Sequence, residues 1–329
     1  MGMDLIAELR AWFKRLMMIA VIGALAIASL AAYGFYYYEA NGPLAQESTL
    51  IFKRGEGFQA IVGDMAQAGI ISDPLLFKVI AVASGEARTF KAGEYHFTAA
   101  ISPQSVMEMI AGGRVVIHKL TIAEGLTVQQ VIQLLNNEKA LDGAITGNIA
   151  EGTLLPETYH FTYGDRRQEL ISRMQAGMSA AMAELWEKRK DGLPFATPAQ
   201  ALVLASIVEK ETGVDSERGR VASVFINRLR KGMKLQSDPT VAYGLHKSGE
   251  VLTLADLRAP TPYNTYVIDG LPPTPIANPG RASIEAVLHP PDTAELYFVA
   301  TGSGGHNFSS TLQEHNANVR EYREKMAKQ

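Results

Sequence analysis

Two glutamates offer acid–base chemistry in the stretch ASIVEKETG at residues 205–213, namely Glu209 and Glu211. A carboxyl group can donate a proton to a leaving group and later accept a proton, as a general acid and base does. In a helix each residue advances by about 100°, so the two side chains project about 200° apart. We therefore expect only one of them to face a given cleft.

The helical face favours Glu211 as the acid. It follows Val208, Ile207 and Leu204 by three, four and seven positions and so extends an apolar row, whereas Glu209 lies on a mixed face. Burial on an apolar stripe raises the pKa of a carboxyl group, and a raised pKa suits an acid that works near neutral pH. Most glutamates on amphipathic helices are solvated, so periodicity alone leaves Glu209, or neither residue, as an open alternative.

The elements that must position these residues follow one another closely. Thr197-Pro198 predicts the start of the helix that carries the two glutamates, and Gly213 predicts its end. A second helix should extend to Gly232. Loops rich in Pro and Gly come next, and ELYFVATGSGGHNFSS at residues 295–310 predicts two strands joined by a glycine turn. We expect the loops to form an ordered binding wall.

The N-terminal part of the chain predicts a membrane anchor. Residues 16–38 contain no charged side chain, and as a helix they cover roughly 34 Å, enough for a hydrocarbon core of roughly 30 Å. Arg10, Lys14 and Arg15 precede this run, and four tyrosines end it. Because basic residues stay cytoplasmic, the rest of the chain should lie outside the cytoplasm. A cleaved signal peptide is the alternative, although the apolar run is long for one.

Composition excludes several classes of protein. The net charge of −3 and the absence of basic blocks argue against a nucleic-acid binder. The chain has no cysteine, so disulfides and thiolate metal sites are excluded. Its seven histidines show no metal-ligand spacing, and no Gly-x-Ser-x-Gly motif is present. We expect neither a metal nor a cofactor.

Between the anchor and the glutamates, the sequence predicts a small α+β module. GEGFQAIVGDMAQAGII at residues 55–71 and AEGLTVQQVIQLLNNEKAL at residues 123–141 share Glu-Gly, a short gap and helical apolar spacing. A shorter helix should begin at Ser102-Pro103. STLIFKR at residues 48–54 and RVVIHKLTIA at residues 114–123 are typical of strands. Carbohydrate binding and plain packing remain equally open for this module.

Many phrases in the right order make the chain resemble the endolytic lytic transglycosylases of the YceG/MltG type, which are membrane-anchored enzymes that cut peptidoglycan. The phrases are KAGEY, TIAEGLT, EGTLLPETYHF, LASIVEKET, VFINRL, LQSDPTVAYG, YNTYVIDGLPPTPIANPG and LYFVATGSGGHNFS. Together they cover nearly all of the chain after the anchor. The resemblance implies that the catalytic glutamate corresponds to Glu211, with Glu209 as the second choice.

The resemblance also implies a reaction and a substrate. A lytic transglycosylase cleaves the β-1,4 bond between N-acetylmuramic acid and N-acetylglucosamine within nascent strands without water. The C6 hydroxyl of the sugar attacks instead, which leaves a 1,6-anhydro end, and one glutamate serves as acid and base. Tyrosines can stack on sugar faces, and amides can bind N-acetyl groups. The residues expected to contact substrate are Gln236, Ser237, Asp238, Tyr263, Asn264, Thr265 and Tyr266.

We therefore expect an α+β fold in several parts. These are a cytoplasmic N-terminus (1–15), a transmembrane helix (16–38), a linker (39–48), a LysM-like α+β module region (49–150) and a mixed helical and β catalytic domain (151–329). The resemblance implies a single-pass protein of the inner membrane, with its catalytic domain in the periplasm and a cell-wall synthase, such as a penicillin-binding protein, as partner. A hydrolytic muramidase and a non-catalytic peptidoglycan-binding scaffold are the alternatives.

Overall fold

The chain forms two compact units with mixed α and β structure. The computed structural model describes residues 2–327, and it describes side chains from residue 8 onward. One unit comprises Met1–His118 and Phe161–Gly164, and the other comprises Lys119–His160 and Asp165–Gln329. The mixed α+β class is confirmed, with short two-stranded sheets among the described residues. The predicted boundary at residue 150 falls inside the second unit, and the LysM-like character of the module stays a prediction. Met1 and residues 328–329 of the expected segments lie outside the described residues.

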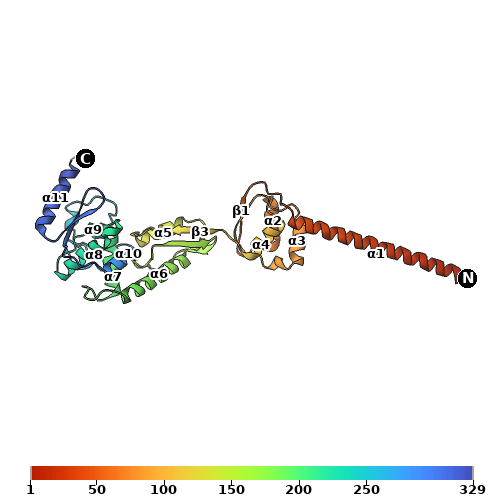
Figure 1. Cartoon of the computed structure of the whole chain (residues 1–329), viewed down its shortest axis with the longest axis horizontal. Coiled ribbons are helices and arrows are strands. Elements are labelled where there is room, and N and C mark those ends of the chain that lie inside the picture. Colours follow the sequence, from red (N-terminus) through yellow and green to blue (C-terminus); the bar gives the residue numbers. More distant parts are fainter. Residues whose placement is uncertain (1, 328–329) are drawn as a thin grey trace. The chain divides into compact units, whose positions relative to one another are not determined.

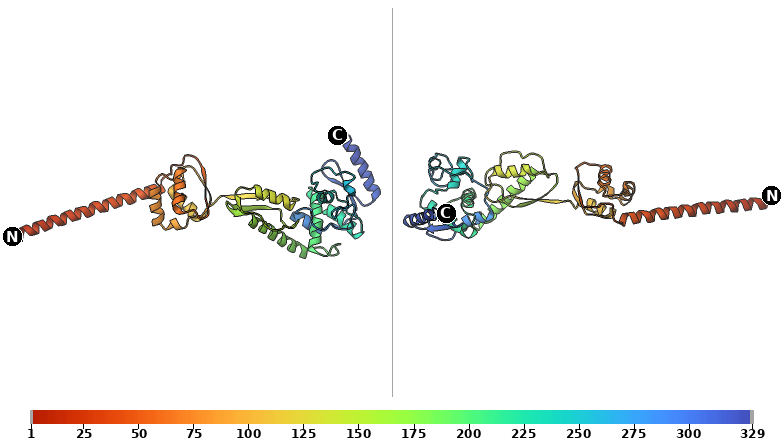
Figure 2. Two further views of the ribbon diagram at one scale, coloured as in Figure 1. Left: turned by 180° about the vertical axis from the view of Figure 1, so that it is seen from behind. Right: turned by 90° about the horizontal axis from the view of Figure 1, so that it is seen from above.

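The first unit begins with the long helix α1 (Gly2–Glu39), which is drawn in red in Figure 1. Its stretch Glu8–Glu39 is long and apolar enough to cross a membrane, and its most apolar window is not buried within the protein. The views from two further sides show that α1 extends away from the other elements of its unit (Figure 2). The predicted span 16–38 lies within this helix.

The rest of the first unit is a small α+β module. Strand β1 (Ser48–Phe52) pairs antiparallel with β2 (Gly93–Phe97). The helices are α2 (Phe58–Gln67), α3 (Pro74–Ala83) and α4 (Pro103–Gly112), with a 3₁₀ turn η1 (Glu86–Arg88). The predicted start of α4 is confirmed, since Ser102 caps it by accepting a hydrogen bond from the Ser105 amide at 3.2 Å.

The predicted linker between α1 and β1 is packed onto the module. Leu44 is buried in the core, and its carbonyl accepts a hydrogen bond from the Ala100 amide at 2.8 Å. A Cβ atom at Gly42 would lie 2.1 Å from the Ile101 carbonyl oxygen, so this close approach of two backbones requires glycine. The module is therefore tied closely to the end of α1.

The second unit starts with short strands and two helices. Strand β3 (Ile117–Thr121) pairs with β5 (Thr158–Thr162), and the division between the units falls within these strands. Strand β4 (Leu141–Asp142) runs parallel to β6 (Asp165–Arg166). The helices of this part are α5 (Val128–Asn137) and α6 (Arg167–Glu187).

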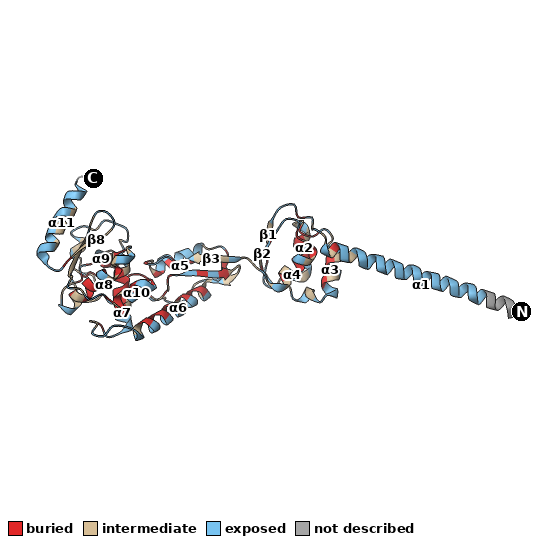
Figure 3. Ribbon diagram, viewed as in Figure 1, coloured by how far each residue is buried: buried red, intermediate tan, exposed pale blue. Residues whose placement is uncertain are grey.

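A helical core follows, and it positions the two glutamates. It contains α7 (Pro198–Glu211), α8 (Asp215–Arg230), α9 (Asp238–Gly244), a 3₁₀ turn η2 (Asp256–Arg258) and α10 (Arg281–Leu288). The predicted strands are β7 (Tyr297–Ala300) and β8 (His306–Ser309), an antiparallel pair, and α11 (Leu312–Met326) ends the described chain. Buried residues gather on α7, α8 and α10 (Figure 3). The predicted start of α7 is confirmed by a capping box of Thr197 and Gln200.

Candidate active site

Glu211 is the last residue of α7, and its side chain is half-buried. Burial is the main reason that the pKa of this carboxyl is raised to about 7, and the charge of Asp238 raises it further. A hydrogen bond from Ser237 and the charge of Arg228 partly lower it. Its place at the C-terminal end of the helix acts in the same direction as burial, because the helix dipole there disfavours negative charge. Glu211 thus keeps access to solvent in a setting that favours its protonated form.

Ser237 holds the Glu211 carboxyl from the loop before α9. The Ser237 hydroxyl donates a hydrogen bond to Oε1 of Glu211. The backbone amide of the same serine donates to Oγ1 of Thr265 at 2.9 Å, and Thr265 in turn bonds Oγ1 of Thr240 at 2.8 Å. All three hydroxyl residues are buried. The donor to Glu211 is therefore fixed by a second, separate loop.

Asp238 and Tyr266 lie on the open side of this frame. The Tyr266 hydroxyl donates to Oδ1 of Asp238 at 2.7 Å, and burial, followed by Asp238, raises the pKa of the tyrosine strongly. Gln236 is exposed and has a positive φ of 53°. Its backbone amide donates a hydrogen bond to the Thr265 carbonyl at 3.1 Å. A non-glycine residue with this φ is uncommon and is strained unless its surroundings hold it. The hydrogen bond to Thr265 provides part of that support.

Asn264 and Thr265 face the protein interior, since neither has any exposed surface. The side-chain nitrogen of Asn264 donates to the carbonyls of Leu257 at 3.1 Å and Ala259 at 2.8 Å. Its side-chain oxygen accepts from the backbone amide of Tyr266 at 3.0 Å. All the hydrogen-bonding groups of this side chain are therefore used inside the loop. Because they are buried, these two residues differ from the members of the expected binding wall that are exposed.

Tyr263 is half-buried, and its ring packs edge-on against Tyr243 with centroids 4.9 Å apart. Its hydroxyl shares a hydrogen bond with Oγ1 of Thr274 at 2.8 Å. One edge of the tyrosine therefore supports the proline-rich loop. The structure brings Glu211, Ser237, Asp238 and Tyr266 together and places Tyr263 beside Tyr243.

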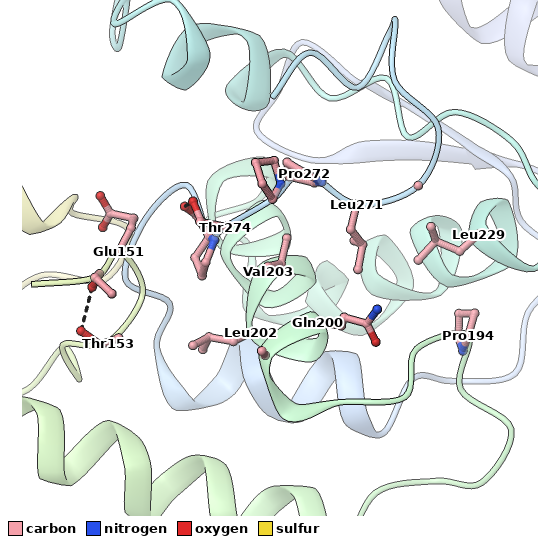
Figure 4. A pocket seen from close by; sticks show the side chains of 15 residues that line it. Glu151, Thr153, Pro194, Gln200, Leu202, Val203, Leu229, Leu271, Pro272 and Thr274 are labelled. Carbon is pink, nitrogen blue, oxygen red and sulfur yellow. Dashed lines mark hydrogen bonds between the residues drawn. The ribbon is translucent and has the colours of Figure 1, made fainter. Parts of the chain in front are cut away.

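Two hollows in the second unit flank α7. One has a volume of about 470 Å³ and contains Lys210, Asp238 and Tyr243, the first two being chain neighbours of Glu211 and Ser237. The other has a volume of about 640 Å³ and is lined by Leu202, Val203 and the proline-rich segment around Pro272 (Figure 4). Glu211 lines neither of these two hollows. Asp238, whose charge acts on Glu211, lines the smaller of the two hollows.

The phrases that surround this constellation match known proteins. The sequence model of the YceG-like family matches residues 50–321, which is most of the chain. The chain belongs to the YceG-like family.

Several relatives of this YceG-like protein carry a functional name. A Bacillus subtilis protein named endolytic murein transglycosylase is 31% identical over 301 residues, which cover 82% of each chain. A Streptococcus pneumoniae protein of the same name is 27% identical, and the alignment covers 91% of this chain and 63% of that protein. The crystal structure, at 2.6 Å, of a protein of Listeria monocytogenes described as yceG-like has a TM-score of 0.52 and 30% identity, covering 83% of this chain and 99% of that one.

Glu209 of this YceG-like protein faces the start of α10. Its Oε2 accepts a hydrogen bond from the Gly280 amide at 2.8 Å. That amide is at the N-terminal end of α10, where helix dipoles favour negative charge. A Cβ atom at Gly280 would lie 1.7 Å from Oε1 of Glu124, so a larger residue there would have to push the exposed Glu124 side chain aside. Glu209 is half-buried and bonded, rather than a solvated surface charge.

Arg228 acts on the Glu211 carboxyl in the YceG-like protein and was missed by sequence reasoning. It is buried on α8, and its guanidinium donates to the Leu235 carbonyl at 2.7 Å and to Oε1 of Gln236 at 3.4 Å. It thereby holds the start of the loop that carries Ser237, and its charge favours the ionised form of Glu211. The signal was present, because Arg228 follows Phe225 and Val224 by three and four positions on an apolar face.

The YceG-like protein also holds a half-buried carboxyl at Glu151. Its Oε1 accepts from the Val128 amide at 2.9 Å, and its Oε2 accepts from the Tyr243 hydroxyl at 3.4 Å. Burial raises its pKa, partly offset by these hydrogen bonds. Within residues 8–327, no group of three acidic or histidine side chains is arranged to hold a metal ion.

Proposed function

We propose that this protein is a membrane-anchored endolytic murein transglycosylase in which Glu211 is the single general acid and base. The observation that carries the proposal is the half-buried carboxyl at the end of α7, whose pKa is raised to about 7. Near neutral pH the protonated and the ionised forms of such a group are both populated. A residue that first donates a proton and later accepts one needs both forms. The names of the Bacillus and Streptococcus relatives support the substrate.

The proposed reaction needs no external water. Glu211 gives its proton to the oxygen of the β-1,4 bond between N-acetylmuramic acid and N-acetylglucosamine as the bond from C1 to that oxygen breaks. The C6 hydroxyl of the same N-acetylmuramic acid attacks C1, and its proton passes to the Glu211 carboxylate. A 1,6-anhydro end forms, and the acid is restored. An attack from within one sugar gains its rate from proximity.

The wall residues divide by burial into two proposed roles. Gln236, Asp238 and Tyr266 have exposed surface, so we assign them contacts with the glycan, together with the accessible edge of Tyr263. Amide and phenol groups suit the hydroxyl and N-acetyl groups of a sugar. The buried residues Ser237, Asn264 and Thr265 position these contacts and the acid.

Asp238 favours hydrolysis as a second candidate function. Its carboxylate lies near enough to raise the pKa of Glu211, and two carboxyl groups are what a hydrolytic muramidase uses. The products separate the two reactions, because hydrolysis adds a water that the anhydro end lacks. Mass spectrometry of the digest therefore decides between them.

We also propose that α1 anchors the chain as a single transmembrane helix. Arg10, Lys14 and Arg15 lie on the N-terminal side of its apolar run, which favours a cytoplasmic N-terminus and a catalytic unit outside the cytoplasm. The anchor would keep the enzyme near nascent strands, which are made at the membrane.

The test compares two variants with the same chemical change on the same helix. Glu211→Gln removes the acid, and we expect cleavage of purified peptidoglycan by the full chain to fall by about 1,000-fold or more. Glu209→Gln is the matched control, because its amide oxygen can still accept from the Gly280 amide, so activity should stay within about threefold of the parent. Equal activity of the parent and Glu211→Gln would overturn the proposed acid, and loss in Glu209→Gln alone would transfer the role to Glu209.

A further inference from the structure

An apolar stripe on α3 faces solvent. Leu75, Val79 and Val82 are 73%, 57% and 65% exposed, and their spacing of four and three residues places them on one face. Phe77 and Ala81, on the other face, are buried in the core of the module. A ten-residue helix of which one face fills the core and the other exposes large aliphatic side chains needs a second apolar environment.

The stripe lies beside the last turns of α1. Leu75, Leu76 and Val79 line one groove of about 730 Å³ together with Leu30 and Gly34 of α1. A Cβ atom built on Gly34 would touch Leu76 at 4.0 Å. The apolar faces of the two helices are thus continuous.

The length of α1 sets the depth of this contact. A hydrocarbon core of about 30 Å takes about 20 helical residues, which corresponds to residues 16–35 when counted from the last basic residue, Arg15. Gly34 is then at the outer boundary of the core, and Tyr33 and Tyr36 are exposed at the level of the headgroups. Because α3 packs at Gly34, its stripe is at the same level.

We propose that α3 is an interfacial helix that lies in the outer surface of the bilayer and docks the module onto the lipid. This inference rests on the proposed anchoring by α1 and adds a second contact with the membrane. Lys78 is the one charged residue of α3, and its amine can reach a lipid phosphate while its stem lies along the apolar surface. Asp73, at the helix start, is occupied as the cap, accepting from the Leu76 amide at 2.9 Å.

Lipid fits this stripe better than a protein partner does. Leu75 and Val79 share a groove with α1 residues that must themselves face lipid, so a partner would have to displace lipid from both helices. The stripe has only aliphatic side chains, without the aromatic or arginine anchors that are common at protein interfaces. The packed segment at Gly42 and Leu44 limits how far the module can move from the end of α1.

The test uses the absence of native cysteines. In the full chain, Val79→Cys carries an environment-sensitive fluorophore on the new thiol. The chain is reconstituted in lipid nanodiscs, in which both faces of the bilayer are open to solvent. Gln59→Cys, at an exposed polar position of α2, is the matched control. Doxyl-labelled lipid should quench the label at residue 79, and iodide should quench it about fivefold less than the label at residue 59.

Two further measurements make the result decisive. Leu75→Ser with Val82→Ser in the Val79→Cys background should bring iodide quenching close to that of the control, since the stripe then no longer partitions into lipid. Co-elution with the nanodiscs reports the α1 anchor separately, so a chain that co-elutes while its residue 79 is as open to iodide as residue 59 overturns the α3 contact alone. A label shielded from both quenchers would mean that protein covers the stripe, which also overturns it.

Discussion

The hydrogen bond from Ser237 to Glu211 allows the proposed acid to be tuned without being removed. The serine hydroxyl donates to the carboxyl and thereby favours its charged form, which lowers the pKa that burial has raised. In Ser237→Ala this donor is lost, while the backbone amide that bonds Thr265 remains. We expect the pKa of Glu211 to rise above its value of about 7.

The size of the effect follows from the strength of hydrogen bonds. A bond to a charged group contributes about 1.5–3 kcal/mol and a bond to a neutral group about 0.5–1.5 kcal/mol, so losing the donor favours the protonated form by about 1.4 kcal/mol. That difference moves the midpoint of a titration by about one pH unit. At pH 8 the protonated fraction should then rise from about one tenth to about one half.

The assay is the pH dependence of kcat/KM for cleavage of purified glycan strands between pH 5 and 9. The acid must be protonated to start the reaction, so activity falls as the pH rises through the pKa. The alkaline limb of the parent should have its midpoint near pH 7, and that of Ser237→Ala should be about one pH unit higher. When each profile is scaled to its plateau, Ser237→Ala should be about fivefold more active at pH 8. An unchanged midpoint, or one moved to lower pH, would refute the reasoning.

Two other changes test the frame around the acid. Asp238→Asn removes a negative charge that raises the pKa of Glu211, so the alkaline limb should move to lower pH, opposite to Ser237→Ala; a shift in the same direction would contradict the assigned electrostatics. Asn264→Ala leaves the Leu257 carbonyl and the Tyr266 amide without partners and removes one of two hydrogen bonds to the Ala259 carbonyl, which should cost about 3 kcal/mol and lower the melting temperature of the second unit by roughly 6–12 °C. Asn136→Ala, at an exposed position of α5, should change stability by less than about 0.5 kcal/mol, and equal melting temperatures of the two variants would contradict the bracing role of Asn264.

The sequence predicted most elements because their ends carry strong local signals. Thr197-Pro198 starts α7 with a capping box, and Ser102-Pro103 starts α4. The glycine turn between β7 and β8 was equally readable. The division of the chain into units was harder to predict, because the paired residues of β3 and β5 are at least 37 positions apart in the sequence. The hydrogen bond between Thr121 and Thr158 is an example. Such pairing between distant segments has no local signal.

The side-chain roles in the loops were less predictable than the elements. Tyrosine and asparagine types suggested a sugar-binding wall, yet composition does not reveal which way a loop residue points. Asn264 is enclosed because a loop without regular structure must satisfy its own carbonyls, and an amide side chain can bond three of its backbone groups at once. Arg228 stands on an apolar face in the sequence, but its role could not be predicted, since a buried guanidinium is unusual and its partners are loop carbonyls that follow the helix.

The two glutamates of α7 differ because the ends of two helices treat charge in opposite ways. Glu209 accepts a hydrogen bond from the Gly280 amide at the N-terminal end of α10. Glu211 is at the C-terminal end of its own helix, where the dipole and burial both oppose ionisation. A separation of two residues therefore places the Glu209 carboxyl against a backbone amide and the Glu211 carboxyl where burial raises its pKa. Moving the end of α7 by even one turn would remove the second setting, so the extended conformation at Thr212 that ends the helix is itself part of the proposed acid's environment.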